Sequence, residues 1–202
     1  MDIKEIKAKI NKNSPVPLGV NEFYSVLLPL FENSGELQIV FQVRAEELST
    51  QPGEISLPGG KIEDNEHRAQ TALRETREEL SLSGDKVELF GELDFLVTPY
   101  NLIIYSFCGR LQINSLDDIE YNTGEVKDIF AVPLRYFKDN PPDCYKLKIK
   151  KVPVDEFPYQ LIPGGKNYNW REGFFPVYFY KYQGHIIWGF TAKIIKSFIG
   201  LL

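Results

Sequence analysis

The sequence predicts a fold of the α+β or α/β type, in which a mixed β-sheet is covered by helices. Strand-like runs come first, one strong helix follows, and more strands precede a terminal helix, which is the order expected of such a sheet. The 202 residues include 43% hydrophobic side chains, enough to bury a sizeable core. No linker is long enough to divide the chain, so we expect a single domain over residues 1–202.

The first part of the chain is expected to form a helix and then a β-hairpin. Residues 2–12 repeat isoleucine at helical spacing, which predicts a short amphipathic helix. Two apolar runs, residues 22–30 and 37–44, are joined by a turn that contains glycine, and this pattern predicts a hairpin. Pro29 indicates that the pairing of the first strand stops there or that this strand lies at an edge.

The middle of the chain holds a loop followed by the strongest helix prediction. Residues 45–64 contain two Pro-Gly pairs, so they predict a long loop with a short extended piece at residues 54–57. Residues 65–80 contain neither Gly nor Pro and are rich in Glu, Arg, Ala and Leu. These residue types favour a helix over the whole segment.

The rest of the chain is expected to complete the sheet and to close with a helix. Apolar runs bounded by turn residues predict the strands, and the last apolar segment predicts the helix. Strands are expected at 87–97, 102–112, 125–132, 145–152, 174–183 and 185–190, with a short helix ending near Lys138 and a terminal helix at 191–202.

The composition limits the class of function. The formal net charge of −5 argues against a sequence-independent nucleic-acid binder, which needs a basic surface. The N-terminus lacks the apolar run of a signal peptide, and the longest apolar stretches are too short to span a bilayer. With two cysteines, no disulfide framework is predicted. We therefore expect a soluble, cytoplasmic protein with no nucleic-acid or membrane partner.

Three carboxylates in the predicted central helix suggest a cation site. Glu75, Glu78 and Glu79 stand three and four residues apart, which places them on one helix face within about 6 Å of one another at Cβ. Their repulsion would become coordination if a hard cation such as Mg²⁺ were bound. Such a cation would also attract an anionic substrate to an acidic protein. The alternative is a solvated face whose charges pair with Arg74 and Arg77.

The residues before this cluster extend the pattern. Gly60 lies six residues before Glu66, and Glu66 lies eight residues before Arg74, which opens the run Arg-Glu-Thr-Arg-Glu-Glu-Leu-Ser-Leu. Together, residues 60–82 resemble the Nudix box, in which a glycine, a glutamate and an Arg-Glu-x-x-Glu-Glu run follow at these spacings. Every charged position of the pattern matches, so the cation site becomes the favoured interpretation.

Two positions depart from the pattern of the Nudix box. Thr76 stands where an aliphatic residue is usual, a mild change for a helix residue that faces a sheet. Ser81 stands where a glycine usually ends the helix in a left-handed conformation. The turn after the helix is therefore in question, and Gly84 is the residue expected to take it over.

The resemblance implies a Nudix-type α/β/α sandwich and hydrolysis of a diphosphate linkage with Mg²⁺ or Mn²⁺ as the cofactor. Glu66 and Arg74 are implied to form a buried ion pair that fixes the loop against the helix. Glu78 would bind the metal directly or through water and is a catalytic candidate. The implied metal site consists of the Gly60 carbonyl, Glu75, Glu78 and Glu79.

A general base would have to come from outside the helix or from Glu78. Glu120 and Glu125 lie in the stretch that returns toward the site after the sheet crossing, and either one is a candidate for a base or a metal ligand. The alternative for both residues is an exposed loop charge.

The sequence before the box resembles a particular branch of the family, the coenzyme A pyrophosphatases. Arg44 after the second strand and the run Gly-Glu-Ile-Ser-Leu-Pro-Gly-Gly-Lys at residues 53–61 match that branch. Ala45 replaces the usual serine and Leu57 the usual phenylalanine. Two later segments, residues 122–134 and 187–192, also resemble it.

This branch implies a coenzyme A-like nucleotide as the small-molecule partner, cleaved to 3′,5′-ADP and 4′-phosphopantetheine. Arg44, Gln51 and Lys61 are the candidate substrate-binding residues. Three alternating lysines at residues 146–150 could also meet the 3′-phosphate, but an edge strand protected from aggregation is the favoured interpretation.

Two alternatives remain open. The box specifies diphosphate chemistry and says little about the flanking groups, so ADP-ribose, NADH or a dinucleoside polyphosphate could be the substrate. A Nudix-like module that senses a nucleotide without cleaving it is disfavoured, because a sensor has no need of three clustered carboxylates. The sequence also leaves a homodimer open.

Overall fold

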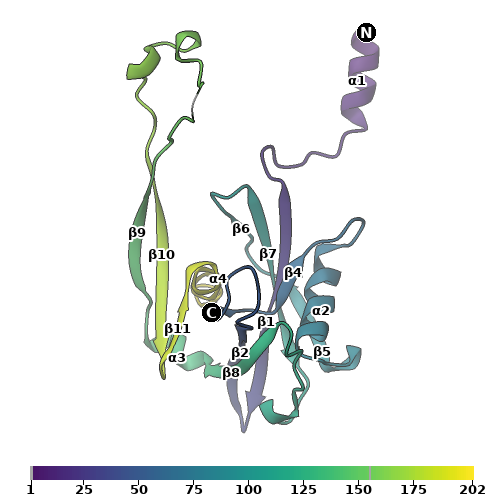
Figure 1. The fold of residues 1–202 in the computed structure, drawn as a ribbon. Coiled ribbons are helices and arrows are strands. Elements are labelled where there is room, and N and C mark those ends of the chain that lie inside the picture. Colours follow the sequence, from purple (N-terminus) through teal and green to yellow (C-terminus); the bar gives the residue numbers. More distant parts are fainter. Residues whose placement is uncertain (1, 155) are drawn as a thin grey trace.

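The computed structural model describes residues 2–154 and 156–202, and its larger sheet has eight strands (Figure 1). These are β1 (Glu22–Asn33), β2 (Glu36–Arg44), β3 (Ile55–Ser56), β4 (Gly59–Lys61), β5 (Val87–Glu92), β6 (Leu96–Val97), β7 (Leu102–Leu111) and β8 (Val126–Pro133). The main path runs β3-β2-β1-β7-β5, while β4 pairs with β1, β6 with β7 and β8 with β2. The β1–β7 pair is parallel and β1–β2 antiparallel, which confirms the predicted mixed sheet.

A second, smaller sheet follows the first in the chain. It contains β9 (Asp143–Ile149), β10 (Gly173–Tyr182) and β11 (His185–Trp188) in the order β11-β10-β9. The β9–β10 hairpin and the long connection between its strands project away from the larger sheet (Figure 1). Every residue of β9 is exposed and β9 is an edge strand, so Lys146 and Lys148 lie on an edge strand as the sequence predicts. The strand ends at Ile149, before Lys150.

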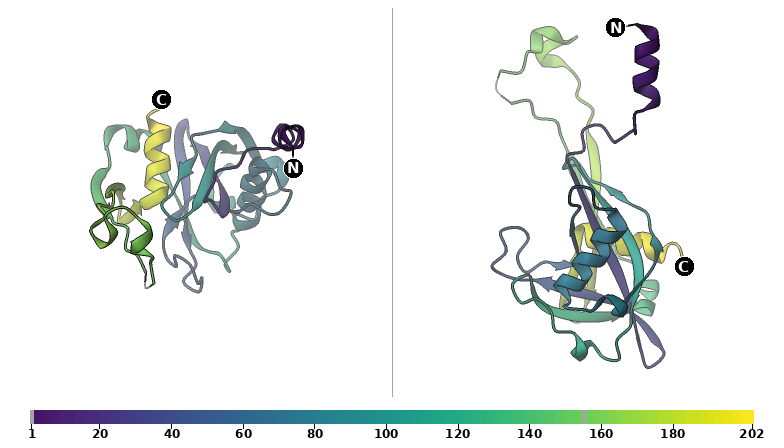
Figure 2. Two further views of the ribbon diagram at one scale, coloured as in Figure 1. Left: turned by 90° about the horizontal axis from the view of Figure 1, so that it is seen from above. Right: turned by 90° about the vertical axis from the view of Figure 1, so that its right-hand side faces the viewer.

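In the described part of the chain, four α-helices accompany the sheets: α1 (Ile3–Asn11), α2 (Arg68–Glu79), α3 (Leu134–Asp139) and α4 (Gly189–Ile199). Helices α2 and α4 lie on opposite faces of the larger sheet (Figure 2), which confirms the α/β/α sandwich. Helix α1 buries no residue and stands apart from the rest. Short 3₁₀ turns lie at Gly84–Lys86, Leu116–Asp118, Tyr159–Leu161 and Gly165–Asn167.

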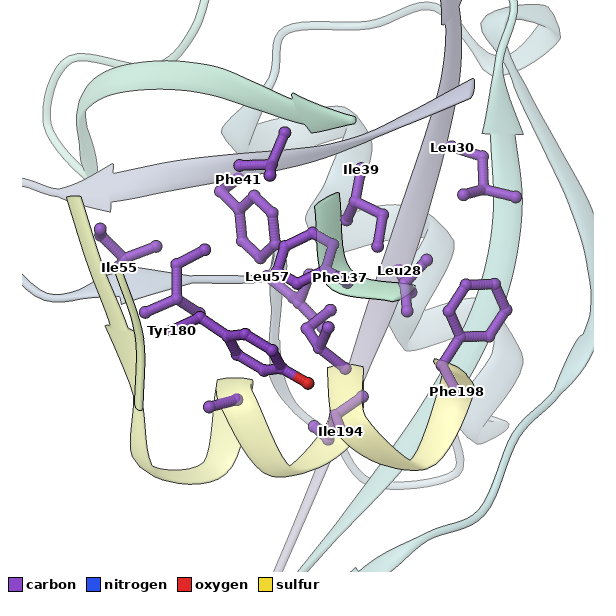
Figure 3. Packing of buried hydrophobic residues seen from close by; sticks show 14 of the residues in the cluster. Leu28, Leu30, Ile39, Phe41, Ile55, Leu57, Phe137, Tyr180, Ile194 and Phe198 are labelled. Carbon is purple, nitrogen blue, oxygen red and sulfur yellow. The ribbon is translucent and has the colours of Figure 1, made fainter. Parts of the chain in front are cut away.

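Two hydrophobic clusters hold the layers together, one on each face of the larger sheet. Because successive strand residues point to opposite faces, Ile39 and Phe41 of β2 enter one cluster and Val40 enters the other. The first cluster packs under α4 and includes Phe137 and Tyr180 (Figure 3). The second packs under α2 and includes Leu27, Phe31, Ala72, Leu80 and Phe107.

The prediction that strand pairing stops at Pro29, or that its strand lies at an edge, is wrong. β1 is central and continues through Pro29 to Asn33. Along one side it pairs first with β4 and then, from Leu30 onward, with β2, so Pro29 lies at the change of partner. A residue without an N–H group is tolerated at such a junction.

Two other boundaries differ from the predictions. The central helix begins at Arg68, because Asn65 adopts a left-handed conformation (φ 66°) and His67 is the extended N-cap, whose Nδ1 accepts from Ala69 N over 3.3 Å. The strand expected at residues 87–97 is divided into β5 and β6, with residues 93–95 between them. Within β5, a bulge shifts the β5–β7 register between Leu89 and Gly91.

Neither cysteine forms a disulfide in the described part of the chain. Cys144 is exposed, and burial raises the pKa of the Cys108 thiol to about 11. Among the described residues, no helix has the length and apolar character needed to traverse a bilayer.

Candidate active site

Helix α2 is fixed against the sheet by contacts at its start and along its buried face. Ser25 Oγ of β1 donates a 2.7 Å hydrogen bond to the carbonyl of Arg68, in the first turn of the helix. Thr76, fully buried, donates from its hydroxyl to the carbonyl of Ala72 over 2.6 Å. The threonine that replaces the usual aliphatic residue therefore satisfies its polar group within the helix.

Glu79 is the most deeply placed carboxylate of the cluster. Its exposed fraction is 4%, and its Oε2 accepts a 2.8 Å hydrogen bond from the main-chain N–H of Gly59. Burial raises its pKa to about 7, and the charges of Glu75 and Glu125 act in the same direction. A buried carboxylate with one backbone donor and two acidic neighbours is a group that a cation would stabilise.

A side chain at Gly59 or at Gly60 would collide with a different part of the structure at each position. Gly59 has φ 153°, and a Cβ there would lie 2.6 Å from Val26 Cα of the adjacent β1. A Cβ on Gly60 would lie among the atoms of the Glu75 carboxylate, 2.6 Å from Oε2. The backbone at Gly60 therefore lies directly against Glu75, as the Nudix resemblance implies for a shared ligand site.

Arg74 links the loop to the acidic cluster. Its Nε and Nη2 contact the two carboxylate oxygens of Glu66 over 2.9 and 3.1 Å, and its Nη1 contacts Glu75 over 2.8 Å and Glu78 over 3.1 Å. The hydrogen bonds from Arg74 lower the pKa of Glu66 to about 2. The implied ion pair is present, although it is partly exposed, with 16% of the Glu66 side chain accessible.

The three carboxylates differ in environment. Burial raises the pKa of Glu75, while the charge of Arg74 lowers it. Glu78 is 56% exposed on the outer side of the helix, with Arg74 as its ion-pair partner. The helix thus presents one buried, one half-buried and one exposed carboxylate.

Gln42 on β2 is a site residue that the sequence reasoning did not single out. It is 1% exposed, and it lies close enough to lower the pKa of Glu79. Neither its amide nitrogen nor its amide oxygen completes a hydrogen bond of good geometry with another described residue. An uncharged polar residue within the apolar run Ile-Val-Phe-Gln-Val at residues 39–43 was the available signal.

The stretch that contains the two candidate bases returns to the site at the end of α2. Asn122 N donates to the carbonyl of Glu79 over 2.9 Å, and Ala45 N donates to the carbonyl of Glu125 over 2.9 Å. The charge of Glu125 raises the pKa of both Glu75 and Glu79. Glu120 and Glu125 are both exposed, but Glu125 is the one whose charge acts on Glu75 and Glu79, so Glu125 is favoured of the two.

The three candidate substrate residues lie around the loop before the glycines. Arg44 Nη2 donates to the carbonyl of Thr50 over 3.2 Å, while its buried Nε has no partner among the described residues. Gln51 is exposed at a left-handed turn position with φ 53°. Lys61 forms an exposed ion pair with Glu22 over 3.0 Å. Of the three, Arg44 is the one with an unpaired buried donor.

The turn that ends α2 forms without glycine. Ser81 itself adopts the left-handed conformation, with φ 49°, and Leu82 N donates to the carbonyl of Arg77 over 2.9 Å. Gly84 instead begins a 3₁₀ turn. The expectation that Gly84 takes over the turn is wrong, because Ser81 itself adopts the left-handed conformation despite the strain in its backbone.

The donor set fits a hard divalent cation. Glu75 and Glu79 offer carboxylate oxygens beside the buried amide of Gln42 and the backbone at Gly60. Across residues 2–154 and 156–202, no three His, Cys, Asp or Glu side chains converge closely enough to enclose an ion. Mg²⁺ does not need such a cage, because it retains water ligands and uses one or two carboxylates beside substrate phosphates. Arg74 Nη1 is the cation that now contacts Glu75.

Sequence comparisons relate the chain to a known protein family. Residues 23–144 match the sequence profile of the NUDIX domain. The chain is 37% identical over 176 residues to the peroxisomal coenzyme A diphosphatase NUDT7 of Mus musculus, covering 82% of this chain and 72% of that protein. It is 27% identical over 180 residues to the mitochondrial coenzyme A diphosphatase NUDT8 of Homo sapiens, covering 88% of this chain and 68% of that protein.

The solved structure of a MutT/nudix family protein from Enterococcus faecalis is similar in fold. Its TM-score is 0.51 at 13% sequence identity, over 100% of this chain and 70% of that one. At this identity the likeness concerns the fold alone. The chain also spans only about half the length of some curated relatives, 55% and 48% of two further Nudix hydrolases.

Proposed function

The chain belongs to the Nudix family of pyrophosphohydrolases, and we propose that it hydrolyses the diphosphate linkage of coenzyme A or acyl-coenzyme A. The products would be 3′,5′-ADP and 4′-phosphopantetheine or its acyl derivative. The single observation that carries the chemistry is the buried Glu79 carboxylate, held by Gly59 N beside Glu75. The substrate assignment is supported by the two relatives that are named coenzyme A diphosphatases.

Nudix enzymes use divalent metal ions, and we propose Mg²⁺ or Mn²⁺ here. The ion, when bound, would lower the pKa of a water molecule and neutralise charge on the departing phosphate. Glu75 and Glu79, with the Gly60 carbonyl, are the proposed direct ligands, and Glu78 is proposed to bind directly or through water. Glu66 would act only as support, by holding Arg74 and thereby the loop against the helix.

The reaction adds one water molecule across a phosphoric anhydride. The water oxygen forms a bond to one phosphorus, the bridging P–O bond breaks, and the bridging oxygen leaves with the second phosphate. Glu125 is the proposed acceptor of the water proton, because its charge acts on both buried carboxylates. Glu120 and Glu78 are the other candidates for this role. Arg44 is proposed to contact substrate phosphate, since its buried Nε is unpaired among the described residues.

The test is turnover of coenzyme A beside ADP-ribose, NADH and a dinucleoside polyphosphate, each with Mg²⁺ and with EDTA. Metal-dependent release of 3′,5′-ADP, with kcat/KM highest for coenzyme A, is the expected result. Faster cleavage of another dinucleotide would retain the chemistry and overturn the substrate. Binding without cleavage of any of them would instead indicate a nucleotide sensor.

A cytoplasmic location is also a proposal, because the two relatives above are named for the peroxisome and the mitochondrion. Fractionation of cells that express the tagged chain would test it. The small-molecule substrate makes a nucleic-acid or membrane partner unnecessary, and sedimentation would distinguish a monomer from a homodimer.

A further inference from the structure

A cavity of about 480 Å³ lies between the larger sheet and the β10–β11 hairpin. One wall comes from β2, β3 and the loop before β3, and the opposite wall comes from β10, β11 and the turn between them. The second wall lies outside residues 23–144, the part that matches the Nudix domain. The residues that bear on its chemistry are Val43, Glu54, Ile55, Phe179, His185 and Trp188.

The outer wall carries two aromatic rings that are stacked on one another. Phe179 and Trp188 are direct partners across β10 and β11, so their side chains share one face of the hairpin. Their rings are nearly parallel, with an interplanar angle of 11° and centroids 5.8 Å apart. Trp188 is 40% exposed, so part of this residue remains accessible to a ligand. Such a pair offers a stacking platform for a planar ring.

The remaining lining determines what kind of ring fits. Glu54, half-buried, supplies a carboxylate, which accepts hydrogen bonds and repels phosphate. Arg44 lies near enough to influence Glu54 electrostatically. His185 is held flat against Phe130, with ring centroids 3.8 Å apart, so its ring is already packed on one side. A ligand that fits this lining has an aromatic ring with an amino group that donates to the Glu54 carboxylate. The phosphates of such a ligand must lie outside the cavity.

The cavity lies on the opposite face of the larger sheet from the acidic cluster, at the same edge of that sheet. Val43 and Ile55 line it and are paired across β2 and β3, and the adjoining pair is Gln42 and Ser56. Gln42 is the residue that lies beside Glu79. Because β3 ends the path of the larger sheet, a ligand can extend past this edge from the cavity toward the carboxylates.

We propose that this cavity binds the adenine ring of the substrate, stacked on the Phe179–Trp188 platform with its exocyclic amino group donating to the Glu54 carboxylate. The proposal rests on the proposed function, because the adenine is that of coenzyme A. It assigns base recognition to the β10–β11 hairpin, which lies outside the family-wide domain. The diphosphate then points away from Glu54, toward Arg44 and the acidic cluster.

The first measurement is tryptophan fluorescence without metal and without turnover. Trp170 and Trp188 are the two tryptophans, so in the Trp170→Phe protein the signal comes from Trp188. Titration in EDTA with AMP or 3′,5′-ADP is expected to quench the signal saturably. CMP should bind more weakly, and 4′-phosphopantetheine should leave the signal unchanged. Quenching by 4′-phosphopantetheine alone would assign the cavity to the other half of the substrate and overturn the proposal.

The variants test each contact separately by calorimetry. Trp188→Leu should weaken AMP binding at least about tenfold, whereas Trp188→Phe, which retains a ring, should restore most of it. Phe174→Leu is a matched control on the same hairpin, since Phe174 is exposed and does not line the cavity. Equal affinity for AMP in the Trp188→Leu and wild-type proteins, both folded by circular dichroism, would overturn the stacking assignment.

The amino group is tested with IMP, which lacks it. The wild-type protein should prefer AMP to IMP, and Glu54→Ala should remove that preference. An unchanged preference would overturn the role of Glu54. Failure of the proposed function is distinguishable: adenine nucleotides would still bind in EDTA although coenzyme A is not cleaved. Cleavage of coenzyme A with adenine binding insensitive to Trp188 would instead overturn the subsite alone.

Discussion

The main-chain nitrogen of Gly59 donates a 2.8 Å hydrogen bond to Oε2 of Glu79, at the far end of the helix that follows the loop. The contact fixes the buried carboxylate relative to the Gly59–Gly60 backbone. It also leaves the second carboxylate oxygen available to another partner. Loop and helix therefore act as one unit, and changes in either should alter the proposed cation site.

The two adjacent glycines should respond differently to alanine. In Gly60→Ala the new methyl group meets the movable end of Glu75, so the protein should fold but lose about 100-fold in kcat/KM through misplacement of that carboxylate. In Gly59→Ala it meets the backbone of Val26, so folding itself should fail. Thermal melting and steady-state kinetics would check both. A fully active Gly60→Ala protein would contradict the proposed role of this backbone.

Glu79→Gln should abolish turnover while leaving the fold nearly intact, because it removes a proposed ligand and preserves the shape of the side chain. Binding of Mn²⁺, measured by calorimetry, should weaken in parallel. Glu36→Gln is the matched control, since Glu36 is an exposed glutamate with no proposed role in the site. Retained activity of Glu79→Gln at saturating Mg²⁺ would rule out the assignment.

The same carboxylate predicts a pH dependence of stability in the metal-free protein. Burial raises the pKa of Glu79 from 4.5 to about 7, so the folded state binds more protons than the unfolded state between these values. The corresponding stability is present below pH 4.5 and is lost as pH rises through 7, by about 3 kcal/mol. Urea unfolding in EDTA should show this loss for wild type and not for Glu79→Gln. Identical pH profiles for the two proteins would refute it.

Gln42 is expected to position Glu79 rather than to react. Gln42→Ala should lower metal affinity or kcat/KM about 10- to 100-fold, the usual effect of losing a residue that orients a ligand. Its neighbour Val43 points to the opposite face, so Val43→Ala should reduce stability with a smaller effect on metal affinity. Mn²⁺ titration of both variants would separate positioning from packing. The idea fails if both variants lose metal affinity equally.

Glu125 and Glu120 can be compared directly. If Glu125 accepts the water proton, Glu125→Gln should lower kcat about 100-fold or more with little change in KM. Glu120→Gln should have little effect, because Glu120 lies outside the contact between this segment and α2. Steady-state kinetics of the pair decides between them, and the reverse ranking would transfer the role to Glu120.

Ser81→Gly should stabilise the protein. An L-residue in the left-handed conformation is strained, and glycine relieves the strain at some cost in unfolded-state entropy. The net gain should be about 0.5–1 kcal/mol, or a rise in Tm of about 1–4 °C. Ser81 is exposed, so no other packing changes. A lower Tm would show that the serine contributes something beyond the turn.

Much of this arrangement could be predicted from the sequence, because it depends on local patterns. Helix α2, the β1–β2 hairpin and the terminal hairpin and helix follow from periodicity and turn residues. The resemblance to the Nudix box also implied the Glu66–Arg74 contact, which joins residues eight positions apart. These features need only the chain geometry between near neighbours.

What could not be predicted depends on partners distant in the chain. Pro29 is tolerated because β1 changes its partner there, which no local pattern reveals. The proximity of Gln42 to Glu79 requires β2 to pair with β1, the strand on which α2 packs. The cavity joins Val43 to Trp188, from opposite ends of the domain. Such relationships arise from sheet order rather than from sequence spacing.

The position of Arg74 has a consequence for the protein in the absence of metal. Its guanidinium group holds Glu66 with one edge and contacts Glu75 and Glu78 with the remaining nitrogen. In the absence of metal, Arg74 therefore offsets the electrostatic repulsion among the carboxylates of the acidic cluster. Removal of the metal by a chelator should therefore abolish activity without unfolding the protein. An incoming cation has to displace the Arg74 guanidinium group from Glu75 and Glu78. A diphosphate substrate supplies further oxygen ligands to that cation, so it favours cation binding over the Arg74 contacts.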